Sequence, residues 1–303
     1  MIRVLLKKVF PRSCKNALFN AFGKIIWKFY QVSVKCKLSK VYVFQPCEML
    51  LITIAYNNEA LIRKQIELIK KYIKDENYTH VIVDNSPKRE KRKIIKEICD
   101  ANKVDYVAIP FSIEQRICNY FSLFSHSHGN ALNWTFYHLI KQSKPKRFAL
   151  LDHDIFPIRD CNLTECLGDL DFYGAGRERG NTWYIWPGWS IFRFDAIVSR
   201  QPNFQPVFLK DIYLDAGGGN YFQIYRHYEL NHSFFPKVKT YRIKQSKDLF
   251  AHDEIYHSDC VQFVGNDWLH IINGSNYCKL KDKDALVEKI INNISYFQSD
   301  SFC

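Results

Sequence analysis

Acidic residues are absent from the first 47 positions of the chain, although these positions hold ten lysines and arginines. The whole chain of 303 residues carries a formal charge of +12, so the excess lies mostly in this segment. A strongly basic chain raises the possibility of nucleic-acid binding. Because the basicity is confined to residues 1–47 and the rest is almost neutral, the charge argues against nucleic acid and favours an anionic membrane surface.

Long apolar runs are also lacking. The longest uncharged stretch, residues 118–140, contains Asn, Ser, His and Gly, which excludes a bilayer span. Basic residues interrupt the apolar positions of residues 1–23, so no signal-peptide core is present there. We therefore expect a cytoplasmic protein, either free or peripheral on the cytoplasmic face of a membrane.

No C-x-x-C pair occurs among the ten cysteines, which argues against a zinc ribbon or knuckle and favours free, buried thiols. Internal repeats and low-complexity tracts are absent as well. The composition, 47% hydrophobic and 24% charged, is that of an ordinary globular chain and excludes a disordered one.

Residues 1–47 form a basic leader that we expect to contain an amphipathic helix. Its apolar residues recur at three- and four-residue steps: Leu18, Phe22, Ile25, Phe29 and Val32. Lys24 and Lys28 lie on another side of the same helix. Two interpretations stay open: the apolar stripe lies in the headgroup layer of a membrane, or it packs on the main domain.

Strand and helix patterns alternate from residue 49 onward, which predicts an α/β fold with a mainly parallel central sheet and right-handed crossovers. The predicted strands are residues 49–56, 80–84, 104–109 and 147–151, and the helices between them cover residues 62–73, 88–102 and 129–140. Further along, the sequence predicts strands at 183–186 and 189–194, separated by Pro187 and Gly188, then a strand at 237–243 and a helix over 283–297.

Polar residues follow three of the predicted parallel strands. Tyr56 and Asn57 follow the first, Asp84 and Asn85 the second, and Asp152-His153-Asp154 the fourth. Ligands in such sheets bind at the carboxyl ends of the strands. The sequence therefore predicts a binding site at this edge.

Asp152 and Asp154 carry the sharpest chemical signal. Two carboxylates one residue apart repel each other unless a positive group lies near them, and a divalent cation such as Mg²⁺ or Mn²⁺ suits oxygen ligands. A diphosphate could complete the cation's coordination, and the cation would offset the charge on a leaving group.

With this motif in place, residues 50–275 resemble the GT-A-fold glycosyltransferases, the nucleotide-sugar-dependent enzymes that build bacterial or viral glycans. The resemblance implies a GT-A (Rossmann-like) catalytic domain over residues 48–278, and the leader lies outside it. Apolar residues at helical spacing predict a C-terminal helix in residues 279–303 that packs on the domain. The resemblance also implies that Asp154 is the direct metal ligand, with Asp152 nearer the ribose or a metal-bound water.

The same resemblance assigns further site residues. Nucleotide-sugar contacts are expected from Tyr56, Asn57, Asp84, Asn85, Gly129, Asn133, Asp152, Gly188 and Trp189. His270, in Asp267-Trp268-Leu269-His270, is expected to join Asp152 and Asp154 at the metal, with His252 and His257 as competing candidates. Asp215 occupies the place of the family's catalytic acidic residue. The family pattern there is Glu-Asp, whereas this chain has Leu214-Asp215, so Asp211 is held as a second candidate base.

Together these features predict a metal-dependent glycosyltransferase that moves a hexosyl or pentosyl unit from a nucleoside diphosphate-sugar, with a UDP-sugar favoured. The acceptor is expected to be a hydroxyl of a glycan or lipid-linked sugar in polysaccharide biosynthesis, with inversion at the sugar carbon. The alternative is a non-catalytic nucleotide-sugar-binding or membrane-docked scaffold protein. A phosphatase-like hydrolase fits less well, because Phe156 replaces the Thr or Val that such enzymes have after the second Asp.

Overall fold

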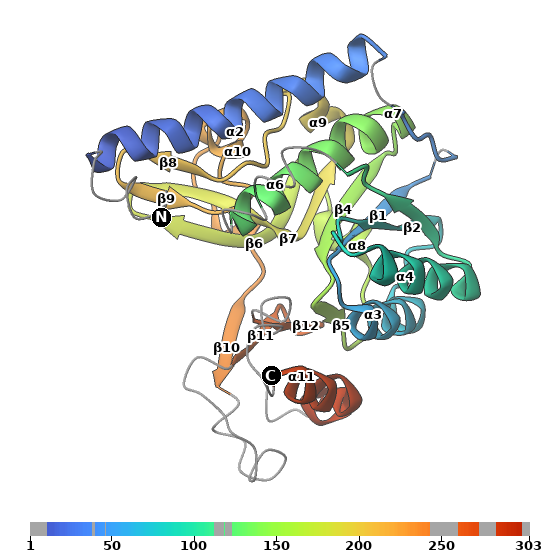
Figure 1. Cartoon of the computed structure of the whole chain (residues 1–303). Helices are drawn as coiled ribbons and strands as arrows, with labels where there is room; N and C mark the ends of the chain where they lie inside the picture. Colours follow the sequence, from blue (N-terminus) through green and yellow to red (C-terminus); the bar gives the residue numbers. More distant parts are fainter. Residues whose placement is uncertain are drawn as a thin grey trace.

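The computed structural model describes residues 11–37, 40–45, 47–111, 118, 123–242, 260–272 and 283–298. A six-stranded sheet forms its centre, with strand order β3-β2-β1-β4-β7-β6 (Figure 1). The strands are β1 (Met49–Ala55), β2 (Tyr78–Asp84), β3 (Asp105–Ala108), β4 (Arg147–Asp152), β6 (Phe172–Arg179) and β7 (Thr182–Arg193). The first four pair in parallel and β7 is antiparallel to its neighbours. The predicted α/β class with a mainly parallel central sheet is confirmed.

Helices connect the parallel strands. They are α3 (Glu59–Tyr72), α4 (Arg89–Asn102), and α6 (Phe124–Thr135), which continues into a π-helical turn (Phe136–Ile140) and α7 (Lys141–Ser143). Helices α3 and α4 bury one face each, whereas α6 and the turn after it are buried on almost every side. In α3, the Asn58 side chain caps the first turn by accepting from the Leu61 N–H at 3.1 Å. The predicted stripe of Ile62, Ile66 and Ile69 is fully buried. The helical period of the sequence therefore correctly identifies the buried face of α3.

Strand β7 differs from the sequence prediction, because Pro187 and Gly188 do not break it. The strand runs without interruption from Thr182 to Arg193. Its pairing with β6 shifts register between Gly174 and Gly176, so the positions from Trp186 to Trp189 have no partner on β6. Pro187 lies in this irregular stretch, where its missing N–H costs no ladder hydrogen bond.

A second sheet lies beside the first and has the order β10-β11-β12-β5. Its strands are β5 (Ile155–Pro157), β10 (Val238–Arg242), β11 (Cys260–Val264) and β12 (Trp268–Ile271). Because β4 ends at Asp152 and β5 begins at Ile155, the Asp152-His153-Asp154 turn joins the two sheets. Helix α11 (Lys283–Asn292) and a 3-10 turn (Ile294–Gln298) cover the second sheet, and Ile290 packs there in one cluster with Leu61 of α3.

The remaining elements are short, and most of them contact β6 or β7. They are α8 (Leu163–Leu167), α9 (Phe194–Val198), the hairpin of β8 (Val207–Leu209) and β9 (Ile212–Leu214), α10 (Asn220–Gln223), and 3-10 turns at Tyr225–His227 and His232–Phe234. Seven cysteines are found free: Cys14 and Cys36 are exposed, Cys47, Cys99, Cys118 and Cys161 are buried, and Cys166 is half-buried.

Helix α2 (Arg12–Lys35) extends along one edge of the molecule and contacts α6 and β8 (Figure 1). The face that packs on the domain is not the predicted apolar stripe. Ile26, Trp27 and Tyr30 are buried, whereas Leu18 and Ile25 of the stripe are exposed. The interpretation that the stripe packs on the main domain is therefore wrong, apart from the partly buried Phe22. Residues 1–10, 38, 39 and 46 of the predicted leader, and residues 279–282 and 299–303 of the predicted tail, lie outside the described residues.

Candidate functional site

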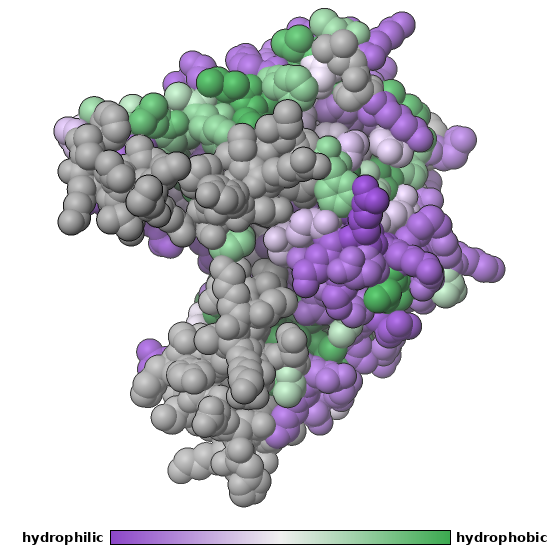
Figure 2. Space-filling view, in the orientation of Figure 1, coloured by the Kyte–Doolittle hydropathy of each residue, from purple (hydrophilic) through white to green (hydrophobic). Residues whose placement is uncertain are grey.

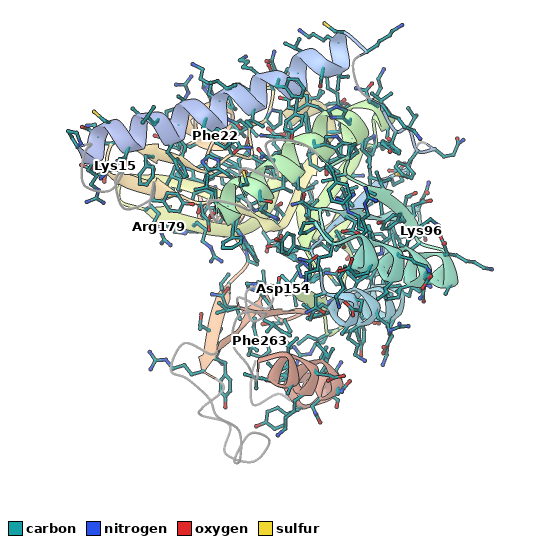
Figure 3. The ribbon with its side chains drawn as sticks, in the orientation of Figure 1. Lys15, Phe22, Lys96, Asp154, Arg179 and Phe263 are labelled. Atoms are coloured by element: carbon teal, nitrogen blue, oxygen red, sulfur yellow. The ribbon has the colours of Figure 1, made fainter. Side chains whose placement is uncertain are left out.

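A cavity of about 350 Å³ opens at the carboxyl ends of the parallel strands, between the two sheets. This is the predicted edge of the sheet, and the volume is in the range of small-molecule sites. Six predicted site residues line it: Tyr56, Asn85, Asp152, Asp154, Asp215 and His270. Asp154 lies at the junction of the two sheets, and Arg179 lies on the part of the molecule that carries β6 and β7 (Figure 3).

Two of the other predicted residues, Asp84 and Asn57, form hydrogen bonds within the turns that follow β2 and β1. Asp84 is fully buried, and its carboxylate accepts from the Ser86 N–H at 2.8 Å and from the Tyr106 hydroxyl at 2.9 Å. The Asn57 N–H donates to the Ser86 hydroxyl at 2.7 Å, which ties the end of β1 to the end of β2. Neither residue lies on the cavity wall, because these hydrogen bonds draw them into the turns.

The remaining four predicted residues, Gly129, Asn133, Gly188 and Trp189, also lie off the cavity wall. The Asn133 amide accepts from the Phe204 N–H at 2.9 Å, and a Cβ on Gly129 would meet the Phe204 carbonyl at 2.7 Å. These two residues therefore let a loop approach α6 closely. Trp189 is 2% exposed, and a Cβ on Gly188 would meet the Trp186 ring at 2.0 Å. Gly188 thus makes room for Trp186, which does line the cavity.

Asp152 forms an ion pair that the sequence analysis did not identify. Nε2 of His128, in the first turns of α6, lies 3.1 Å from Oδ1 of Asp152. Burial alone would lower the pKa of His128, but Asp152, Asp215 and Asp154 outweigh it and raise that pKa. Burial would conversely raise the pKa of Asp152, and His128 lowers it. All three carboxylates of the cavity therefore stabilise the protonated form of the His128 imidazole.

Asp154 faces a neutral imidazole. Nε2 of His270 lies 3.7 Å from Oδ1 of Asp154, which is too long for a hydrogen bond, and the two residues are 4% and 6% exposed. Nδ1 of His270 lies 3.3 Å from the Gln262 amide oxygen, which can only accept, so the proton sits on Nδ1 and Nε2 keeps its lone pair. Burial lowers the pKa of His270 and keeps the ring uncharged.

This pair fits a divalent cation. A carboxylate oxygen and an imidazole lone pair facing each other can both bind a metal, and the Gln262 amide oxygen would hold the His270 ring in the orientation that this needs. Among the described residues, no group of three or more His, Cys, Asp or Glu side chains is arranged to hold a metal by itself. Two protein ligands are nevertheless enough when a ligand's phosphates supply others. His252 and His257 lie outside the described residues.

A buried network holds the Asp152-His153-Asp154 turn. The Gln65 amide of α3 donates to the carbonyls of Asp152, at 2.7 Å, and Ile155, at 2.6 Å. The Thr53 hydroxyl of β1 donates to the Gln65 amide oxygen at 2.8 Å, and Thr53 in turn lies 3.0 Å from Nε2 of His80. The sequence analysis missed Gln65, although an amide among the isoleucines of the buried stripe was the available signal.

His153, between the two aspartates, is oriented by a hydrogen bond to the backbone of β1. Its Nδ1 lies 3.1 Å from the Ile54 carbonyl, so it donates there and leaves Nε2 unprotonated. Burial lowers the pKa of His153 more than Asp152 raises it. The middle residue of the motif is therefore a neutral ring that links the turn to β1.

Asp215 is exposed on the cavity wall. Oδ1 accepts from the Ala216 N–H at 2.8 Å and from the Tyr213 hydroxyl at 3.3 Å. These bonds orient the carboxylate without burying it. The second candidate, Asp211, lies on the β8–β9 turn and forms an exposed ion pair with Arg12 at 3.9 Å. It does not line the cavity, so the structure favours Asp215 of the two.

Arg177 and Arg179 supply positive charge to the cavity wall and were also missed. They are two residues apart on β6 and therefore point to the same side of the sheet. The Arg177 guanidinium lies 5.1 Å from the centre of the Trp186 ring. The sequence analysis predicted no strand over residues 172–179, so this shared side could not be recognised.

No protein-family profile and no curated protein matches the sequence. Among solved structures, the chain is similar to a mannosyltransferase from Pyrobaculum calidifontis in complex with GDP-Man and Mn²⁺, at 13% identity and a TM-score of 0.37, over 66% of this chain and 59% of that one. It is also similar to S. aureus TarS, at 12% identity and a TM-score of 0.34, over 52% of this chain and 30% of that one.

A third similar structure is the PaToxG glycosyltransferase, at 12% identity and a TM-score of 0.32, over 62% of this chain and 69% of that one. Because all three TM-scores lie below 0.5, these similarities do not by themselves establish an activity. The chain spans less than two thirds of the mannosyltransferase and about a third of TarS. The functional argument therefore rests on the residues of the cavity.

Proposed function

We propose that the protein is a metal-dependent glycosyltransferase that uses a nucleoside diphosphate-sugar. The observation that carries the proposal is the buried pair of Asp154 and the neutral His270, 3.7 Å apart, beside Asp152 in a cavity at the ends of the parallel strands. An exposed third carboxylate, Asp215, lies on the same wall. Such a site combines a cation-binding part with a base that an acceptor can reach.

Asp154 and His270 would hold Mn²⁺ or Mg²⁺, with Asp152 close enough to bind a metal-bound water or a ribose hydroxyl. When bound, the cation would stabilise the negative charge of the departing diphosphate. Arg177 and Arg179 add positive charge to the cavity wall, where the diphosphate oxygens can accept their hydrogen bonds. His128 keeps Asp152 ionised and oriented through the 3.1 Å ion pair.

Asp215 would act as the general base. In an inverting transfer, its carboxylate takes the proton of the acceptor hydroxyl while the hydroxyl oxygen forms a bond to the anomeric carbon of the sugar. The bond between that carbon and the diphosphate oxygen breaks, and the electron pair stays on the diphosphate. The Ala216 N–H and the Tyr213 hydroxyl, which donate to the Asp215 carboxylate, orient it for this step.

The nucleoside part of the donor would lie near Tyr56 and Asn85, which line the cavity at the ends of β1 and β2. UDP is the nucleotide that we propose, carrying a hexosyl or pentosyl unit. The proposed acceptor is a glycan or a lipid-linked sugar in polysaccharide biosynthesis, and the proposed location is the cytoplasm, at or near a membrane. In the described part of the chain, no helix has the length and apolar character that crossing a bilayer requires.

Release of nucleoside diphosphate from a panel of nucleotide sugars, with Mn²⁺ and with EDTA, tests the proposal. We expect release that needs the cation and falls at least about 100-fold in Asp154→Ala. Asp160→Ala is the matched control, since Asp160 is an exposed aspartate paired with Lys74 outside the cavity. Tight binding of a nucleotide sugar with no turnover, with or without an added glycan acceptor, would instead indicate a non-catalytic binding protein.

A further inference from the structure

Helix α2 has two apolar faces, and only one of them is used by the fold. On the inner face, Trp27 donates to the Pro202 carbonyl at 2.9 Å. The Asn20 amide exchanges two hydrogen bonds with the backbone of Phe208, both at 2.8 Å. These bonds fix the helix on the domain through specific polar contacts as well as packing, so its outer face has a defined orientation.

The outer face is apolar and exposed. Leu18, Ile25, Phe29 and Val32 are 59%, 70%, 54% and 50% exposed. Their spacing of seven, four and three residues places them in one stripe along the helix. Figure 2 shows hydrophobic surface along the position that α2 has in Figure 1. An exposed apolar stripe of this length marks an interaction surface.

Lysines border this stripe. Lys24, Lys28 and Lys35 are exposed, and at 100° per residue they lie together along one side of it. None of the ion pairs found within the described residues involves these three lysines, and residues 1–47 contain no Asp or Glu that could neutralise them. The outer face thus combines an apolar centre with an uncompensated positive border.

We infer that this face of α2, defined by Leu18, Ile25, Phe29 and Val32 with Lys24, Lys28 and Lys35, docks on an anionic lipid surface. The apolar side chains would enter the boundary between headgroups and acyl chains, while the lysines contact lipid phosphates. A second copy of the chain is a poorer occupant, because pairing two such faces would bring two rows of uncompensated lysines together.

The docked helix would also set the orientation of the cavity. The Phe19 ring on the inner face of α2 lies 4.0 Å from the His126 ring of α6, and the next residues of α6, Ser127 and His128, line the cavity. The membrane-facing helix is therefore packed directly against the helix that forms part of the cavity wall. This consequence, which suits a lipid-linked acceptor, rests on the proposed function; the docking surface itself does not.

Sedimentation with vesicles tests the inference without any activity measurement. The full chain is mixed with vesicles of phosphatidylcholine alone or of phosphatidylcholine with phosphatidylglycerol, and we expect binding only to the anionic vesicles. Lys24→Gln/Lys35→Gln should weaken this binding by roughly five-fold per lysine. Ile25→Ser/Phe29→Ser, which removes apolar contacts at exposed positions, should weaken it at least as much, with an unchanged melting temperature.

Matched controls are Lys93→Gln/Lys96→Gln, two exposed lysines of α4, and Leu230→Ser, an exposed leucine at 44%. Both controls should bind as the unchanged protein does. The inference is overturned if the protein ignores anionic vesicles, if the α2 variants bind as well as the controls, or if the face instead mediates dimers that Ile25→Ser/Phe29→Ser dissolves. Because nucleoside diphosphate release is measured separately and without vesicles, a failure here leaves the proposed function standing, and the reverse also holds.

Discussion

The His128 ring lies 3.1 Å from the Asp152 carboxylate, and this contact joins the start of α6 to the end of β4. The pair raises the pKa of His128 and lowers that of Asp152, in each case against the effect of burial. Both side chains are about one-fifth to one-quarter exposed, at 24% and 21%, so the pair lies on the cavity wall and not in the core. It therefore keeps one carboxylate of the cavity ionised and in a defined position.

We expect His128→Gln to lower the free energy of unfolding of the metal-free protein by about 1–2 kcal/mol near pH 6. The pKa of His128 is higher in the folded state, so its contribution is complete below its unfolded value of about 6.5 and is lost as the pH rises through the folded value. The difference between the two proteins should consequently shrink in alkaline solution. Urea titrations at several pH values measure it, and a difference that grows with pH would contradict the ion pair.

Gln65→Leu removes the two hydrogen bonds that hold the carbonyls of Asp152 and Ile155. Leaving buried polar groups unpaired costs about 1–3 kcal/mol each, so we expect a loss of stability of that order and weaker Mn²⁺ binding at the loosened turn. Gln142→Leu is the control, since the Gln142 amide donates to the Tyr137 carbonyl away from the cavity. Equal effects of the two substitutions on Mn²⁺ binding would show that Gln65 does not position the turn.

His80 makes the same network sensitive to acid. Burial lowers its pKa from 6.5 to about 3, so the unfolded chain binds the proton first and stability falls as the pH drops from 6.5 towards 3. The slope should approach about 1.4 kcal/mol per pH unit from this residue. His80→Gln, which keeps a donor for the Thr53 hydroxyl, should flatten the acid limb of the stability curve; an unchanged slope would place the sensitivity elsewhere.

Asp215→Asn separates binding from chemistry. The amide keeps the size of the side chain and can still accept from the Ala216 N–H, so donor binding should change by less than about threefold, while kcat for transfer falls by about 100-fold or more. Asp211→Asn, which alters the exposed partner of Arg12, is the matched control and should leave kcat unchanged. Transfer that persists in Asp215→Asn and fails in Asp211→Asn would reverse the assignment.

The order of strands and helices could be predicted from the sequence, because the spacing of apolar residues shows which positions of each element are buried. The seven residues of β1 are all buried, and the stripe of α3 faces the sheet, so these elements were predictable from residue type alone. Pro187 illustrates the limit of such reasoning. Whether a proline ends a strand depends on the register of its neighbour, and the register shift opposite Pro187 is fixed by β6, which no local pattern indicated.

The cavity was predictable only in part, for a similar reason. Strand ends identify residues such as Asp152 and Asn85, since the carboxyl ends of parallel strands share one edge. The contributions of His128 and Arg177 depend on how α6 and β6 are placed against that edge, which is a tertiary property. The small size of Gly129 and Gly188 makes room for Phe204 and Trp186, which local sequence could not indicate, and neither glycine lies on the cavity wall.

The most direct measurement is calorimetric titration of UDP, with GDP in parallel, into the protein and into Asp154→Asn, each with Mn²⁺ and with EDTA. If Asp154 and His270 bind a cation together with the diphosphate, Mn²⁺ will tighten nucleotide binding by at least about tenfold, or about 1.4 kcal/mol, in the unchanged protein and not in Asp154→Asn. Nucleotide binding of equal strength in Mn²⁺ and in EDTA, or an undiminished Mn²⁺ effect in Asp154→Asn, would contradict the account.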